Sequence, residues 1–465
     1  MSTGAISLLS SGPAPDIYGA RLVSQVLTPA PATTADSSPE IDRALARMDA
    51  WLETMRCPGG YGGPVSHWWQ QCLTYTGAGL DWRYEGIIAG YLHLWRRTGG
   101  QHWLDKARRA GDDLVEGQFD NGHFPASAFE LNPATAGTPH EAACDHGLLL
   151  LAQALRDAGA ADWSRYADAA AWNIRAFYLG QLWDEAAQAF RDSPNTVSFV
   201  PNKAATACDA LFLLADLTED DSWVERYALP TLRRLRQHQI AGGPLDGGIA
   251  QNSFGSHVVA KYFPIYMARC IPALLSAYRW TREELYLDSA RRAMMFITRW
   301  HGEGGLPPTV VYANGRLATQ PTWVAALGDV LRAADALHPY GVAVDLDATR
   351  ARLLAGQDAS GGIQTAQGFG GQGLGGAGDL PDFRDLLHVA GWCDKAFRYL
   401  AAHAGPSLPL LPSERFEADC SFRGHTYQFV ETPEQIEAIR SRRVCYRWRK
   451  GAHAPDVAEA EFWLR

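Results

Sequence analysis

The chain has 465 residues, of which 47% are hydrophobic and 20% are charged, so it carries enough apolar side chains for a large folded core. Lys and Arg number 42 against 51 Asp and Glu, and the net charge of -9 argues against broad binding to nucleic acid or to anionic membranes. Eight cysteines without a C-x-x-C pair favour free buried thiols over a disulfide framework or a zinc site. We therefore expect no metal, no cofactor, no nucleic-acid partner and no membrane partner.

Residues 1–39 are predicted to form a disordered or loosely attached leader, because the segment before residue 40 is rich in Pro, Ser and Thr. No Lys or Arg precedes Arg21, so the positively charged start of a secretory signal is missing. A cytoplasmic location is the resulting expectation.

Residues 40–404 are dominated by apolar side chains at three- and four-residue spacing, which predicts amphipathic helices. Six segments carry charge on one face and are expected to form an outer layer: 41–55, 103–118, 163–179, 223–240, 286–300 and 348–357. Six more apolar segments, rich in small residues, are expected to be enclosed: 83–99, 140–159, 202–218, 265–280, 322–337 and 382–400. The two sets alternate along the chain.

Prolines mark a regular repeat in this alternation, since proline is favoured in the first turn of a helix. Five of them, spaced by about 60 residues, precede the expected inner helices: Pro139, Pro201, Pro264, Pro321 and Pro381. Six helical hairpins of this size close into a ring, so the sequence predicts an all-α fold, an (α/α)6 toroid over residues 40–404. An open solenoid is the alternative closure. Short alternating segments in residues 405–465 predict a small C-terminal appendage with strands.

The connections from outer to inner helices are long, whereas the opposite connections are short, which places a binding cleft on the long-loop rim. Indole faces at this rim suit the apolar faces of sugar rings. The side chains predicted to bind a saccharide from these loops are His67, Trp68, Trp69, Trp82 and Trp323.

Polar candidates gather in the first turns of the inner helices. Glu85, Glu141 and Asp145 are the predicted catalytic carboxylates, because glycoside hydrolysis uses one protonated and one ionised carboxyl. Carboxylates at helix starts also complement the helix dipole, so a structural role is the alternative for each. Substrate contacts are predicted for the neighbouring side chains Arg83, His140, His146, Asn202 and Lys203.

A second constellation precedes the fourth inner helix and contains Gln251, Asn252, His257 and Tyr262. An amide that neutralises a uronate, with His or Tyr to remove the α-proton, would equip a polysaccharide lyase. His140 and His257 suit an epimerase as well.

The architecture over residues 40–404 resembles the six-hairpin glycosidase superfamily and its (α/α)6 polysaccharide-lyase relatives. The segment CDHGLLLL, with Asp145, His146 and Gly147, is similar to the second inner helix of unsaturated glucuronyl hydrolases, which carries His-Asp before glycine; the order is reversed here. The resemblance implies a saccharide substrate and a role for Asp145 as acid or base.

These observations predict a carbohydrate-active enzyme, a glycoside hydrolase that acts on acidic, uronate-containing oligo- or polysaccharides through carboxylate catalysis. A lyase or epimerase that uses His and Tyr on the same rim is the first alternative. A saccharide-binding protein without catalysis is the second.

Overall fold

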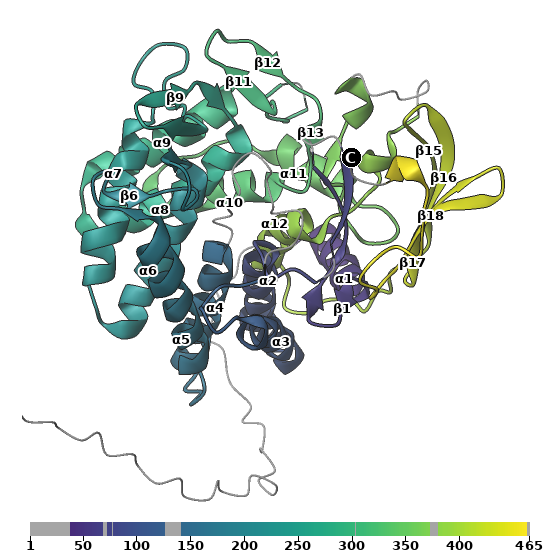
Figure 1. Ribbon diagram of the computed structural model, residues 1–465, viewed down its shortest axis with the longest axis horizontal. Helices are drawn as coiled ribbons and strands as arrows, with labels where there is room; N and C mark the ends of the chain where they lie inside the picture. Colours follow the sequence, from purple (N-terminus) through teal and green to yellow (C-terminus); the bar gives the residue numbers. More distant parts are fainter. Residues whose placement is uncertain are drawn as a thin grey trace, which may run out of the picture.

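A computed structural model describes residues 38–67, 72–76, 78–125, 141–302, 304–372 and 380–462. In this part of the chain twelve α-helices alternate between an outer and an inner position (Figure 1). The outer elements are α1 (Pro39–Thr54), α3 (Gln101–Gly117), α5 (Ser164–Asn173) with the π-helix η2 (Ile174–Leu182), the π-helix η3 (Val224–Ala228) with α7 (Leu229–Gln237), α9 (Glu284–Arg299) and α11 (Asp347–Ala355). The inner helices are α2 (Arg83–Thr98), α4 (Glu141–Asp157), α6 (Pro201–Thr218), α8 (Pro264–Thr281), α10 (Leu327–Leu337) and α12 (Ala390–Ala402).

The inner helices form a closed ring, because each packs against the next and α12 packs against α2. The predicted (α/α)6 toroid is therefore confirmed, and the open solenoid is excluded. Glycines let the inner helices approach closely: a Cβ on Gly86 of α2 would lie 2.5 Å from the carbonyl oxygen of Asp394 on α12. A Cβ on Gly328 of α10 would likewise collide with the backbone of Lys395. These two contacts explain why the inner segments are rich in small residues.

The strands of the toroid lie in the outer-to-inner connections, which form the long-loop rim. They are β1 (Arg56–Cys57), β2 (Gly60–Tyr61), β3 (Gly63–His67), β4 (Cys72–Thr76), β5 (Trp183–Asp184), β6 (Ala189–Phe190), β7 (Ser198–Phe199), β8 (Asn252–Phe254), β9 (His257–Val259), β10 (Lys261–Tyr262), β11 (Val310–Tyr312), β12 (Leu317–Ala318), β13 (Thr322–Trp323) and β14 (Ala366–Gln367). All pairings among them are antiparallel within the described ranges. Short 3-10 turns complete the toroid: η4 (His338–Tyr340), η5 (Phe369–Gln372) and η6 (Phe383–Asp385).

Two inner helices begin later than the sequence predicts. Pro201 and Pro264 do open α6 and α8, but α10 begins at Leu327 and α12 at Ala390. Thr322 and Trp323 pair instead with β14, and the segment before α12 forms η6 and a bridge from Asp382 to Ser421. Tertiary pairing at the rim thus overrides the local helical pattern.

The C-terminal appendage is a five-stranded antiparallel meander in the order β15-β16-β17-β18-β19. Its strands are β15 (Phe416–Phe422), β16 (His425–Glu431), β17 (Gln435–Arg440), β18 (Arg443–Arg449) and β19 (Val457–Ala458), followed by η7 (Ala460–Phe462). Figure 1 shows this sheet, in yellow, beside α1, in purple. Phe383 of η6 packs against four aromatic rings of the appendage, so the sheet shares a hydrophobic core with the toroid. No helix of the described ranges combines the length and the apolar character needed to cross a lipid bilayer.

A buried group of charges, here called the His388 clasp, ties the appendage to the ring. It consists of Asp358, His388, Glu431 and Lys450. The two nitrogens of the His388 ring face different carboxylates: Nδ1 donates to Glu431 over 3.0 Å and Nε2 lies 2.7 Å from Asp358 Oδ2. The other oxygen of Glu431 accepts from Trp51 of α1 and lies 2.8 Å from Lys450 Nζ. Although burial opposes it, the two carboxylates raise the pKa of His388 to about 10, so two cations balance two anions.

Replacement of Glu431 by Ala is expected to destabilise the protein by about 3–5 kcal/mol, because His388 and Lys450 would be left buried without their shared partner. Denaturant unfolding measures this loss. Glu434→Ala is the control, since Glu434 is an exposed neighbour in the same hairpin, and it should change stability by less than about 0.5 kcal/mol. Equal stability of both variants would show that the His388 clasp does not stabilise the fold.

Candidate active site at the axis of the toroid

Each inner helix sends at least one charged side chain to the axis of the ring. We call this group the axial cluster; its members are Glu85 (α2), His146 (α4), Asp209 (α6), Arg269 (α8), Asp329 and Arg332 (α10), and Asp394 and Arg398 (α12). Most of them lie in the first two or three turns of their helices, toward the long-loop rim. Charges buried in this way need partners, and the cluster supplies them internally.

Glu85 is the centre of the axial cluster. Its Oε1 accepts from His146 Nδ1 over 2.7 Å and from Arg269 Nη2 over 2.6 Å, and it lies 3.0 Å from Arg398 Nη1. Burial opposes ionisation of Glu85, yet Arg269, Arg398 and His146 hold its pKa well below the usual range. Glu85 is therefore a permanent anion that joins α2 to α4, α8 and α12.

Asp209 lies in the same cluster but has the opposite tendency. Burial raises its pKa above the usual value, although His146 and Arg269 pull it down. Its Oδ2 is buried and has no hydrogen-bond partner among the described residues. The cluster thus holds two carboxyls whose pKa values are shifted in opposite directions.

The cluster contains three arginines and four carboxyl groups. Arg398 also bonds to Asp329, whose pKa is lowered by Arg398 and Arg332 against the effect of burial. Burial raises the pKa of Asp394 to about 7, so this carboxyl is close to half protonated at neutral pH. Arg269 Nη1 has no hydrogen-bond partner in the described part of the chain.

Glu141 and Asp145 are the other two predicted catalytic carboxylates. They lie on a different face of α4 from His146, the member of the axial cluster on that helix. Glu141 accepts from His123 Nδ1 over 3.0 Å, from the Phe124 N–H over 3.4 Å and from Asn173. Bonding to Glu141 raises the pKa of His123 despite partial burial. His123 is partly exposed beside the rim, and sequence analysis missed it because a lone histidine in a loop carries no pattern.

Asp145 is completely buried in a cavity between α4, α6 and η2. Tyr178, Ile174 and Leu211 are among the apolar and aromatic side chains around it, and the space that they leave is too small for a water molecule. Neither oxygen of Asp145 has a hydrogen-bond partner among the described residues, and burial together with Glu141 raises its pKa well above the usual value. The neighbouring His146, which directly precedes Gly147, faces the axis instead.

Other predicted binding residues are held in the framework. Arg83 is buried and forms a bidentate pair with Asp81 at 2.7 Å for both bonds, and it also donates to the carbonyl of Tyr61. Lys203 pairs with Asp192 at 2.8 Å. Trp323 is buried, with its ring centroid 4.4 Å from that of Trp392. These contacts hold Arg83 and Trp323 within the folded framework.

Trp82 remains half-buried at the rim, 5.1 Å from the Trp392 ring, and Lys395 Nζ lies over both indoles at 5.2 and 5.0 Å. This arrangement leaves Trp82 the one predicted indole with an accessible part in the described structure. Trp68, Trp69, His140 and the side chain of His67 lie outside the described residues.

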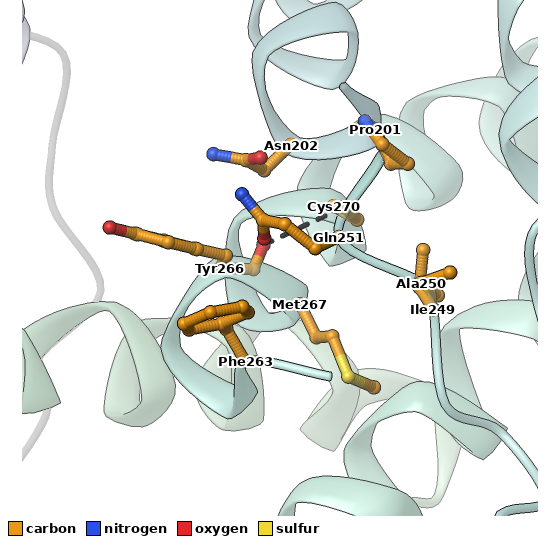
Figure 2. A pocket seen from close by; sticks show the side chains of 9 residues that line it. All are labelled: Pro201, Asn202, Ile249, Ala250, Gln251, Phe263, Tyr266, Met267 and Cys270. Carbon is orange, nitrogen blue, oxygen red and sulfur yellow. Dashed lines mark hydrogen bonds between the residues drawn. The ribbon is translucent and has the colours of Figure 1, made fainter. Parts of the chain in front are cut away.

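The predicted elimination residues do not converge. His257 is exposed in the β8–β9 hairpin, where it pairs with Phe254 and Asn252 pairs with Val259, whereas Tyr262 belongs to the separate sheet β10-β11-β12. Tyr262 is buried, with its ring 5.7 Å from that of Phe296. Gln251 and Asn202, by contrast, line one open pocket near the start of α6 and α8 (Figure 2).

Replacement of Asp145 by Asn tests whether Asp145 contributes to stability or to catalysis. The folded state binds the Asp145 proton more tightly than the unfolded chain, so stability is lost as pH rises above the ordinary carboxyl value of 3.8. Asn cannot ionise, and the variant is expected to be more stable than the native chain by about 1–3 kcal/mol at pH 8, with the difference vanishing near pH 4. Unfolding at both pH values measures this effect. Unchanged turnover is the accompanying expectation, and a large loss of turnover would return Asp145 to the reaction.

Neither a protein-family model nor a curated protein matches the sequence. Among solved structures, the chain is similar to a possible member of the GH105 family from Klebsiella pneumoniae, with a TM-score of 0.56 and 12% identity over 84% of this chain and 98% of that one. It is similar to unsaturated glucuronyl hydrolase from Bacillus sp. GL1, with a TM-score of 0.54 and 14% identity over 78% and 95% of the two chains. A GH76 alpha-1,6-mannanase variant from Salegentibacter sp., bound to alpha-1,6-mannotetrose, gives 0.52 and 12% over 78% and 98%. The chain therefore has the fold of the six-hairpin (α/α)6 toroid enzymes.

Proposed function

We propose that this protein is a carbohydrate-active enzyme that hydrolyses an acidic oligosaccharide at the long-loop rim, above the axial cluster. Two solved structures with this fold are named as glycan hydrolases, and one of them holds an oligosaccharide. Fold alone does not determine chemistry, so the proposal depends on the axial cluster itself.

The observation that carries the proposal is that the axial cluster shifts the pKa values of Glu85 and Asp209 in opposite directions. Hydrolysis of a glycosidic bond needs one carboxyl that donates a proton and one that stays ionised as base or nucleophile. Environments that push two carboxyl pKa values apart assign these roles. Asp209, with its raised pKa, is the proton donor in this proposal, and Glu85 is the ionised partner.

An acidic substrate is proposed from the unused donor of Arg269, whose buried Nη1 has no acceptor among the described residues. A guanidinium recognises a planar carboxylate through two parallel bonds, which suits a uronate.

A second candidate function is favoured by the contact between His146 and Glu85. A carboxylate that accepts from Nδ1 leaves Nε2 of the imidazole free to remove a proton, as an epimerase or a lyase requires. This candidate keeps the saccharide substrate and makes His146 the catalytic base. Glu141 and Asp145 have no part in proton transfer in either candidate.

Replacement of Asp209 by Asn is expected to lower turnover by about two to four orders of magnitude, because the amide cannot donate the acidic proton. Release of reducing ends from a panel of acidic and neutral oligosaccharides measures turnover. Asp216→Asn on the same helix is the control, since Asp216 is an exposed partner of Arg156 and its loss should leave turnover unchanged. Native turnover in Asp209→Asn would contradict the assignment.

The same wells separate the two candidate functions. New reducing ends without ultraviolet absorbance from an unsaturated uronate are expected for hydrolysis. New absorbance, or an isomerised sugar without new reducing ends, would favour the His146 chemistry. In that case His146→Gln should abolish turnover, whereas Asp209→Asn should reduce it less.

A further inference from the structure

Arg332 of α10 differs from the other two arginines of the axial cluster in its contacts with carboxylates. Arg269 and Arg398 both bind Glu85, at 2.6 and 3.0 Å. Arg332 forms one ion contact within the described residues, 3.9 Å between its Nε and Asp329 Oδ1, and this Nε has no hydrogen-bond partner there. The same oxygen of Asp329 already accepts from Arg398. The guanidinium of Arg332 therefore lacks a carboxylate of its own.

Arg332 also lies among like charges. Burial and then Arg398 lower the pKa of Arg332 to about 10, and Arg269 acts in the same direction. Asp329 and Glu85 raise this pKa but do not restore it. A cation next to two others is destabilised unless an anion lies close to it. The carboxylates of the axial cluster supply this compensation to Arg269 and Arg398 more fully than to Arg332.

The close packing of the inner helices shows which residues lie at the height of Arg332. A Cβ on Gly90 of α2 would collide with Phe397 of α12, and a Cβ on Gly328 of α10 would collide with α12 two residues earlier in the chain. These contacts place Arg332 and His93 at nearly the same height, more than one helical turn beyond Glu85. Both residues therefore lie toward the short connections that follow the inner helices, on the side of the ring away from the long-loop rim.

His93 and Arg96 of α2 extend the group of basic side chains around Arg332. Burial lowers the pKa of His93 to about 3, and Arg96, Arg332 and Arg398 lower it further. The imidazole is thus neutral at pH 7 and keeps one N–H donor. Burial also lowers the pKa of Arg96, against the effect of Asp157. Nitrogen donors and positive charge prevail at this height of the ring.

Solvent reaches this group of side chains. The side chain of Arg332 is 26% exposed, and His93 and Arg96 are half-buried. The side chains of Glu85 and Arg398, by contrast, are only 5% and 3% exposed. A small dissolved ion can therefore reach Arg332 without displacing the buried pair of Glu85 and Arg398.

We propose that Arg332 and His93, with the added charge of Arg96, form a binding site for a small inorganic anion such as chloride, inside the half of the ring away from the rim. The guanidinium provides positive charge and N–H donors, and the neutral imidazole provides a further donor. The bound anion offsets the repulsion between Arg332 and the other arginines, and so stabilises the packing of α2 against α12 and of α12 against α10. The site does not depend on which reaction takes place at the rim.

Thermal unfolding of the full-length protein at pH 7 tests the site, with sodium gluconate replaced stepwise by sodium chloride at constant ionic strength. Chloride is expected to raise the melting temperature of the native chain by about 2–4 °C and to saturate, because it binds the folded state. Arg332→Gln should lose this shift and should melt no lower than the native chain in gluconate, since the uncompensated charge is gone. Arg233→Gln is the matched control, because Arg233 is exposed on the outer helix α7, and it should keep the native shift.

The NMR line width of chloride provides a second measurement, which the native chain alone can decide if Arg332→Gln does not fold. Saturable broadening that phosphate displaces and glucuronate does not is the expected result. Absence of this broadening would overturn the site, as would an equal chloride shift in Arg332→Gln and Arg233→Gln. Tighter Arg332-dependent binding of glucuronate than of chloride would also overturn it, because Arg332 would then belong to the substrate site. Phosphate as the stronger ligand would keep the site and identify the ion. Asp209→Asn should retain the chloride shift whatever its turnover, so this proposal and the proposed reaction fail separately.

Discussion

The rest of the structure depends on the interactions that the Glu85 carboxylate makes with its partners. It accepts from His146 and Arg269 and pairs with Arg398, so one anion joins four of the six inner helices. A ring of amphipathic hairpins has no core at its centre unless its inward side chains can meet. Here they meet through charge, and removal of one partner would leave the others buried and uncompensated. The ring and the candidate active site are therefore held by the same bonds.

This arrangement has a consequence for chemistry at the rim. Because Arg269, Arg398 and His146 hold the pKa of Glu85 well below its usual range, Glu85 stays ionised at neutral pH, whereas burial raises the pKa values of Asp209 and Asp394. In the proposed function, the guanidinium groups that hold Glu85 also attract the anionic substrate. Stability and substrate preference thus share residues, so variants of Arg269 or Arg398 should be interpreted with both effects measured.

The ring could be predicted from sequence because it follows from periodicity. Alternating amphipathic and apolar segments gave the hairpins, and Pro201 and Pro264 fixed the start of α6 and α8. Pro321 and Pro381 did not, because the residues after them pair with β14 and β15, which are far away in the sequence. Long-range pairing of short rim strands leaves no local pattern. The C-terminal strands could be predicted because they alternate, whereas their attachment through His388 and Glu431 could not.

The site was predictable only in part, for a similar reason. Glu85, His146, Asn202 and Gln251 stand out as polar residues at the starts of apolar helices or in rim loops, but sequence does not show which way a helix faces. Glu141 and Asp145 share a face of α4 whose neighbours are Asn173 and the side chains of η2, so they have different partners from Glu85. Arg398 and Asp329 lie deep in apolar segments. This position indicates an axial residue more strongly than a place at the start of a helix does, since a charge in an enclosed helix must meet another charge.

The reversed order of Asp145 and His146 has a definite structural result. Adjacent residues of a helix point about 100° apart. In the order Asp145-His146, His146 therefore faces the axis and Asp145 faces the cavity beside η2. A histidine then occupies the axial position that directly precedes Gly147, and a carboxyl must reach the axis from another helix. Asp209 of α6 does so. In the proposed reaction this displacement moves the proton donor from α4 to α6, where burial, His146 and Arg269 act on its pKa.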